Sequence, residues 1–208
     1  MQASKYIPTL LDHLIWVILV VVFVFFVFQS PVFLTSTNIT NILTAAAVLG
    51  ILVVGQTFVL ITGNFDLSSE STLGVTALFG MFLIVPATPP YWGGGIMLNP
   101  YLAIITILLT GALIGYVVGF LITVGKMNNF IVTLAMLLIL RGLMMAFTQG
   151  KPISGLNFEP ADVYFWLGHE ALFEIPDVAR IPLAVVATAA VFGVGHIILN
   201  HRRFGREL

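Results

Sequence analysis

The stretch Thr62-Gly63-Asn64-Phe65-Asp66-Leu67-Ser68-Ser69-Glu70-Ser71 is polar and contains two carboxylates, yet it lies between two apolar runs. We call residues 62–71 the polar segment. The apolar run that follows it, residues 72–85, is shorter than the roughly 20 residues that a helix needs to cross about 30 Å of hydrocarbon. The polar segment is therefore expected to form part of a membrane span or to lie directly at the end of one.

The polar segment allows two interpretations. Gly63 permits a backbone break, and Asp66, Ser68 or Ser69 can accept hydrogen bonds from the free N–H groups of a new helix. This predicts a discontinuous helix over residues 63–71, an arrangement that membrane proteins tolerate where protein or water satisfies the backbone and that is used to build substrate sites. The alternative is a cytoplasmic hairpin loop in which Asp66 only caps the next helix.

The composition is that of a polytopic membrane protein. Of the 208 residues 59% are hydrophobic and 8% are charged, against about 25% charged in soluble domains. We predict an all-α transmembrane bundle, formed by residues 1–208 as a single domain, with about six spans. The predicted spans cover residues 14–28, 39–61, 72–85, 101–124, 130–147 and 182–199.

Charge distribution predicts the orientation. Residues 149–180 are acidic and rich in aromatic side chains, and we interpret them as an extracytoplasmic segment with some amphipathic helix. With six spans and both termini in the cytoplasm, the positive-inside rule is satisfied best. The predicted cytoplasmic cations are Lys5, Lys126, Arg202, Arg203 and Arg206, and the predicted external ones are Lys151 and Arg180.

Arg141 interrupts the fifth predicted span. A charged group in a span costs a few kcal/mol even on insertion scales, so it is a functional candidate. Arg141 is expected either to face a translocation path or to pair with Asp66 or Glu70 across the bundle. The alternative is that its aliphatic stem lets the guanidinium extend to the membrane interface.

Glycine spacing predicts helix contacts. Gly111, Gly115 and Gly119 recur every four residues and share one helical face, where we expect another helix to approach closely. The cluster formed by residues 45–47 and Gly50 gives the second predicted span a similar face.

Motifs for catalysis and metal binding are missing from the sequence. The chain has no cysteine, its four histidines lack ligand spacing, and no phosphate-binding loop, Gly-x-Ser-x-Gly or His-Glu-x-x-His occurs. Asp66 and Glu70, four residues apart, are the one carboxylate pair that an intramembrane enzyme or proton relay would use. We predict no catalytic residue, no metal site and no cofactor.

Three motifs carry a resemblance to a known family. Residues 55–68 resemble a signature that follows the second span in the permease subunits of bacterial ABC importers for monosaccharides, the ribose, xylose and galactose type. Residues 129–134 with 140–142 and 150–155 form a second match, and residues 202–206 form a third. The matches occur in the family's order over almost the whole chain.

The resemblance implies a subunit of the bacterial inner membrane that moves a monosaccharide through the lipid bilayer. Its implied partners are an ATP-hydrolysing subunit, a periplasmic sugar-binding protein and a second permease copy or paralogue, with no nucleic acid. The ATPase-facing candidates are Arg202, Arg203 and Arg206. The candidates for the substrate path are Asn64, Asp66, Ser68, Glu70 and Arg141.

The family pattern continues beyond the point where this chain ends, so we expect a C-terminally incomplete permease domain. Two other functions stay open on sequence grounds. The first is a stand-alone channel or secondary transporter, and the second is a truncated, non-functional permease fragment.

Overall fold

The fold is known from a computed structural model, which describes residues 13–155, 157–169, 171–175 and 179–207. Helices dominate these residues, so the predicted all-α membrane bundle is confirmed. The elements in chain order are α2 (Leu14–Gln29), α3 (Ser36–Ile61), α4 (Ser69–Ile84), α5 (Pro100–Thr123), α6 (Asn129–Thr148), the 3-10 helix η1 (Glu159–Ala161), α7 (Asp162–His169), β1 (Ala171–Ile175), β2 (Ala179–Pro182), α8 (Leu183–His201) and α9 (Arg203–Glu207).

Each of the six predicted spans corresponds to an apolar helix. Among the described residues, the four helices α3, α5, α6 and α8 are long and apolar enough to cross a membrane. The other two, α2 and α4, have 16 residues each, about 24 Å of helix. The protein is therefore a multi-pass membrane protein in which two apolar helices are shorter than a full span.

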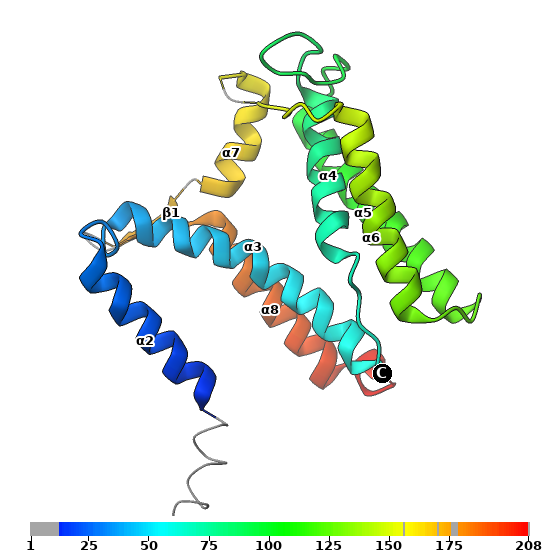
Figure 1. The fold of residues 1–208 in the computed structure, drawn as a ribbon, viewed down its shortest axis with the longest axis horizontal. Coiled ribbons are helices and arrows are strands. Elements are labelled where there is room, and N and C mark those ends of the chain that lie inside the picture. Colours follow the sequence, from blue (N-terminus) through cyan, green and yellow to red (C-terminus); the bar gives the residue numbers. More distant parts are fainter. Residues whose placement is uncertain (1–12, 156, 170, 176–178, 208) are drawn as a thin grey trace, which may run out of the picture.

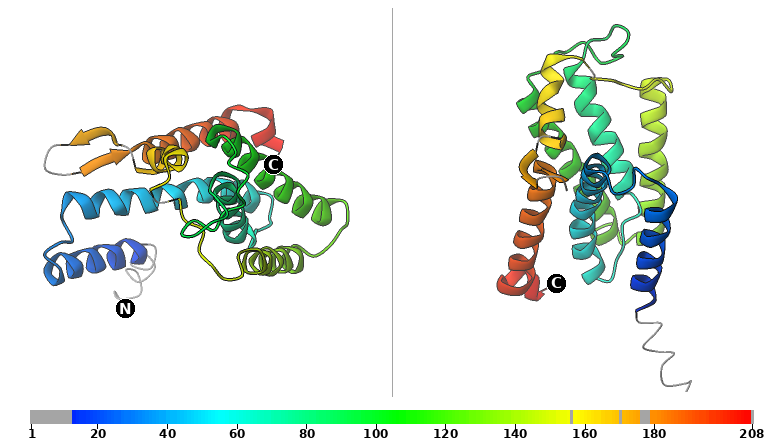
Figure 2. Two further views of the ribbon diagram at one scale, coloured as in Figure 1. Left: turned by 90° about the horizontal axis from the view of Figure 1, so that it is seen from above. Right: turned by 90° about the vertical axis from the view of Figure 1, so that its left-hand side faces the viewer.

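The helices pack in two groups, which Figures 1 and 2 show from three sides. In the first group α4 packs against both α5 and α6, and in the second α3 packs along α8. Helix α2 lies apart from both groups, has no buried residue and makes ring contacts with Phe33 in the turn before α3. The polar segment connects the two groups, because it joins α3 to α4.

Helices α3 and α8 contact each other at residues 45–47 and Gly50, the small residues for which close helix contact was predicted. Ala47 is buried, and its carbonyl accepts a hydrogen bond of 2.9 Å from the Thr188 hydroxyl of α8. A Cβ atom on Gly50 would lie 2.7 Å from Cγ2 of Thr188. The prediction that this part of α3 allows close helix contact is confirmed.

Replacement of Gly50 by leucine is expected to separate α3 from α8, because the new side chain has no space beside Thr188. Overpacking of this kind costs about 1–3 kcal/mol. We expect less protein in the membrane and a lower melting temperature in detergent. Gly55, one and a half turns further along α3, has no atom within 4 Å of a built Cβ, so an equal loss from Gly55→Leu would contradict this explanation.

The polar segment contains the break that Gly63 predicts. Helix α3 ends at Ile61, Gly63 has a φ of +76°, residues 64–66 belong to no helix or strand, and residues 67–68 form a turn before α4 begins at Ser69. Figure 1 shows the chain turning back at the end of α3, so that α4 begins part of the way along α5 and α6. Irregular backbone over residues 62–68 followed by a short helix thus takes the place of one continuous helix.

Residues 149–180 contain η1, α7 and an antiparallel hairpin of β1 and β2. The sequence predicted helix here but not the hairpin. The segment begins beside the connection between α4 and α5, where the Lys151 ammonium lies 4.1 Å from the centre of the Trp92 ring. Glu170 and Asp177, two of its acidic residues, lie outside the described part of the chain.

The turn between α5 and α6, which carries Lys126, and the end of α8, which carries Arg202, lie toward one end of the molecule, the lower end in Figure 1. The connection from α6 to η1, which carries Lys151, lies at the opposite end. This arrangement fits the charge distribution, while the cytoplasmic position of the termini stays a prediction. Lys5 lies outside the described residues.

Candidate functional site

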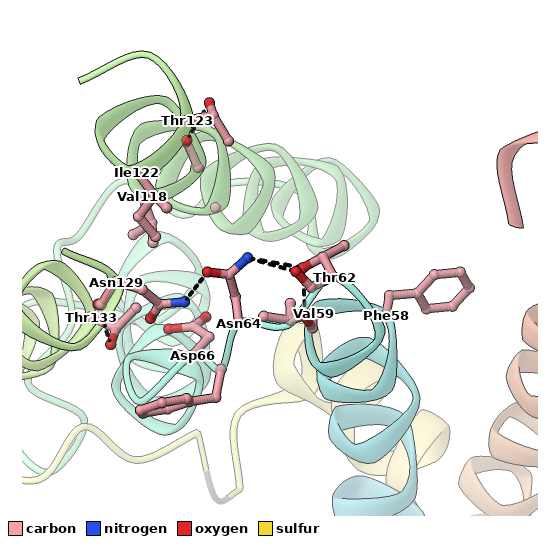
Figure 3. A pocket seen from close by; sticks show the side chains of 13 residues that line it. Phe58, Val59, Thr62, Asn64, Asp66, Val118, Ile122, Thr123, Asn129 and Thr133 are labelled. Atoms are coloured by element: carbon pink, nitrogen blue, oxygen red, sulfur yellow. Dashed lines mark hydrogen bonds between the residues drawn. The ribbon is translucent and has the colours of Figure 1, made fainter. Parts of the chain in front are cut away.

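A cavity of about 360 Å³ lies beside the polar segment. Its wall comes from the end of α3, the irregular residues 64–66, the second half of α5 and the start of α6 (Figure 3). The lining residues are Phe58, Val59, Thr62, Asn64, Phe65, Asp66, Gly115, Val118, Gly119, Ile122, Thr123, Asn129 and Thr133. Apolar side chains therefore form much of the wall, and polar groups are concentrated on the polar segment and α6.

Asp66 organises the start of α4. Its Oδ1 accepts hydrogen bonds from the Ser68 backbone N–H at 2.8 Å and from the Ser68 hydroxyl at 2.6 Å. Its Oδ2 accepts a hydrogen bond of 3.0 Å from the Ser69 hydroxyl. A carboxylate at a helix N-terminus also interacts favourably with the helix dipole. Asp66 thus closes the turn just before α4, whose N-cap is Ser68, and at the same time lines the cavity.

Gln56 holds the polar segment against α3. Its Nε2 donates to the Asp66 carbonyl at 3.3 Å, and its Oε1 accepts from the Ser69 hydroxyl at 3.3 Å. These contacts satisfy backbone and side-chain groups of the non-helical part, as membrane depth requires. Gln56 lies in the motif of residues 55–68 but was not among the predicted site residues.

Two asparagine side chains connect the polar segment to α6. Asn129 Nδ2 donates to Asn64 Oδ1 at 2.8 Å, and Asn64 Nδ2 donates to the Thr62 hydroxyl at 3.1 Å. Figure 3 shows these amides beside Asp66 at the cavity wall. Asn129 Oδ1 is buried and has no hydrogen-bond partner among the described residues. A buried acceptor without a partner is costly, so a ligand or water that donates a hydrogen bond is favoured there.

Asn129 was not among the predicted path residues, although it lies in a motif that carries the family resemblance. The structure shows that Asn128 is the N-cap of α6, with its side chain accepting from the Ile131 backbone N–H at 3.4 Å. A helix has one N-cap position, so when two asparagines stand side by side before a helix only one of them can cap it. The adjacent pair Asn128 and Asn129 is therefore the signal that could have identified Asn129 as available for another contact.

The glycines of α5 have a different role from the one expected. Gly115 and Gly119 line the cavity, and a Cβ atom built on either would have no neighbour within 4 Å. Gly111 alone approaches another helix, with Cγ2 of Thr76 at 3.7 Å. The expectation that all three glycines pack against a helix is wrong, because two of them border open space.

The structure divides the predicted path residues between two places. Asn64 and Asp66 line the cavity, and Ser68 is 1% exposed and donates a hydrogen bond to Asp66. Glu70 and Arg141 do not line the cavity; Arg141 Nη2 lies 3.4 Å from Glu70 Oε1, and both side chains are exposed. Of the two partners considered for Arg141, the structure therefore selects Glu70.

The predicted ATPase-facing residues lie at the end of α8. Arg202 is the C-cap of α8, and Arg203 begins α9; both are exposed. Arg206 is in α9, and its side chain lies outside the described part of the chain. Their role stays a prediction.

The cavity offers neutral hydrogen-bonding groups and one carboxylate that is already bonded to serines. Among the described residues, its lining contains no lysine, arginine or histidine. Within the described residues no group of three histidine, aspartate or glutamate side chains is placed to hold a metal ion. The arrangement is suited to binding an uncharged polar solute by hydrogen bonds.

Comparison with known proteins identifies relatives that are transport proteins. The family described as "Branched-chain amino acid transport system / permease component" matches residues 38–208. The ribose import permease protein RbsC of Escherichia coli K12 is 34% identical over 179 residues, which cover 86% of this chain and 51% of that protein. No solved structure matches the chain.

Two further relatives are also permease proteins. RbsC of Bacillus subtilis is 32% identical over 178 residues, covering 86% of this chain and 50% of that protein. The xylose transport system permease protein XylH of Escherichia coli K12 is 32% identical over 160 residues, covering 72% of this chain and 38% of that protein. This chain thus spans about half the length, or less, of these relatives.

Proposed function

We propose that this chain, which belongs to the branched-chain amino acid transport system / permease component family, acts within the membrane-spanning subunit of an ABC importer for a monosaccharide. The role is transport without catalysis by the chain itself. The path for the solute includes the cavity beside the polar segment, where Asn64, Asp66 and Asn129 meet.

The observation that carries this proposal is the cavity lining, which combines amide and hydroxyl groups with one carboxylate that is already bonded to serines. Sugar hydroxyls can form hydrogen bonds with the polar side chains of the lining, such as Thr62 and Asn64, while the apolar wall contacts the carbon faces of the ring. A zwitterionic amino acid would need a cation for its carboxylate, and the lining supplies none. The chemistry of the cavity and the names of the relatives therefore favour a sugar over the amino acid of the family description.

The proposed partners follow from the same role. An ATP-hydrolysing subunit would contact the end that carries Arg202, Arg203 and Arg206, and a periplasmic sugar-binding protein would contact the opposite end, with residues 149–180. A second permease copy or paralogue would complete the pore. Both termini would then face the cytoplasm of a bacterium, with the chain in the inner membrane.

Uptake of labelled solutes tests the proposal. In cells that make the complete importer containing this chain, we expect uptake of ribose or xylose that depends on the importer, and no uptake of leucine. Cells that lack only this chain serve as the control for other transporters. Importer-dependent uptake of leucine without uptake of any pentose or hexose would contradict the assignment to sugars.

A further inference from the structure

The threonine hydroxyls that line the cavity direct their protons into backbone carbonyls. Thr62 Oγ1 donates at 2.6 Å to the carbonyl three residues earlier, and Thr123 Oγ1 donates at 2.7 Å to the carbonyl four residues earlier. Thr133 Oγ1 also donates to the carbonyl four residues earlier, at 3.0 Å. A carbonyl oxygen only accepts, so each hydroxyl proton lies in this bond. Thr62 and Thr123, the exposed ones, therefore offer a solute lone pairs and no proton.

The two asparagine amides of the wall also use their N–H groups within the protein. Asn64 Nδ2 donates to the carbonyl and to the hydroxyl oxygen of Thr62, at 3.2 and 3.1 Å, which uses both of its N–H groups. Asn129 Nδ2 donates to Asn64 Oδ1 at 2.8 Å and has one further N–H. An amide oxygen has two lone pairs, so Asn64 Oδ1 keeps one for a solute.

Asp66 adds acceptors and no donor. An ionised carboxylate accepts through about four lone-pair sites, and hydrogen bonds from Ser68 and Ser69 occupy three of them. In the part of the chain that the structure describes, no lysine, arginine or histidine side chain lines the cavity to balance these acceptors. The polar side chains of the wall therefore offer a solute acceptors almost throughout, with one N–H of Asn129 as the exception.

We infer that this cavity recognises its solute through the hydrogen bonds that the solute donates, with Thr123 Oγ1 as one of the acceptors. A neutral sugar satisfies the wall because each of its hydroxyls carries a proton. A sugar acid or sugar phosphate brings further acceptors and a negative charge beside Asp66, and acceptors buried against each other stay unsatisfied. The inference rests on the proposed function and adds to it that the cavity excludes anionic sugar derivatives.

Protection of an introduced cysteine measures recognition at the cavity without the sugar-binding protein. The chain has no cysteine of its own, so Ile122→Cys, in the apolar part of the lining, gives this subunit a single thiol that a fluorescent maleimide can label. The complete importer that carries this variant is purified without its sugar-binding protein. Labelling is measured with ribose or xylose, whichever the importer takes up, and with analogues in which fluorine replaces one hydroxyl. Fluorine is similar in size to a hydroxyl but has no proton to donate.

At least one fluorinated analogue is expected to require at least about tenfold more than the parent sugar for half protection, and the corresponding sugar acid should not protect at these concentrations. A difference of less than tenfold for every fluorinated analogue, or protection by the sugar acid, would overturn the inference. Absence of protection by the parent sugar, in an importer that takes this sugar up, would also overturn it. The separate uptake measurement thus distinguishes failure of this inference from failure of the proposed function.

Thr123→Val tests the acceptor directly, because valine has nearly the shape of threonine but no lone pair. We expect this change to raise the half-protecting concentration of the parent sugar at least about threefold, whereas Thr123→Ser, which keeps the hydroxyl, should not. The matched control is Thr106→Val. Thr106 is also on α5 and donates to the carbonyl four residues earlier, at 2.9 Å, but it does not line the cavity. Equal effects of Thr123→Val and Thr106→Val would overturn the inference.

Discussion

Replacement of Gly119 by leucine is expected to reduce sugar uptake at least about tenfold, equivalent to ~1.4 kcal/mol, without reducing the amount of protein in the membrane. Gly119 lies on the cavity wall, and a built Cβ has no atom within 4 Å. The leucine side chain therefore enters the cavity instead of a packed contact. The helix itself should gain stability, since glycine in a helix costs about 0.5–1 kcal/mol relative to alanine.

The measurement compares initial uptake rates with membrane abundance determined by immunoblot for the same cells. Gly193→Leu is the matched control, because Gly193 is an exposed helix glycine of α8 with no atom near its built Cβ and it does not line the cavity. Unchanged uptake by Gly119→Leu at normal abundance would show that the solute does not pass through this cavity.

Replacement of Asp66 by alanine is expected to lower both stability and uptake. The change removes the acceptor for three hydrogen bonds from Ser68 and Ser69. Ser68 is 1% exposed, and each buried donor left without a partner costs about 1–3 kcal/mol. We expect α4 to fray at its start, which lowers the melting temperature of the detergent-solubilised protein and the amount in the membrane.

Asp66→Asn separates hydrogen bonding from charge. Asparagine keeps an Oδ1 that can accept from the Ser68 backbone and hydroxyl groups, so its effect on melting temperature should be less than half that of alanine. If Asp66→Asn lowers the melting temperature as much as Asp66→Ala, the negative charge before α4 matters more than the hydrogen bonds. If Asp66→Ala leaves the melting temperature unchanged, the explanation by hydrogen bonds from Ser68 and Ser69 is wrong.

The sequence contains the information for the helices because their signals are local. Apolar run length predicted the six apolar helices, and each observed boundary lies within a few residues of the expected one. Gly63 predicted the break, since glycine accepts the positive φ found there without steric cost. Of the three capping candidates Asp66, Ser68 and Ser69, the N-cap position is occupied by Ser68, and the motif residues identified the family.

Contacts between distant segments depend on the tertiary structure. The sequence could not show that Asn64 meets Asn129, or that Gly115 and Gly119 border open space, because glycine spacing is the same whether a helix faces a neighbour or a cavity. Arg141 had two candidate carboxylates, and the relative position of α4 and α6 selected Glu70. Local chemistry thus determined which residues form helices, breaks and caps, whereas the packing of helices far apart in sequence decided which polar side chains converge and where a cavity is left.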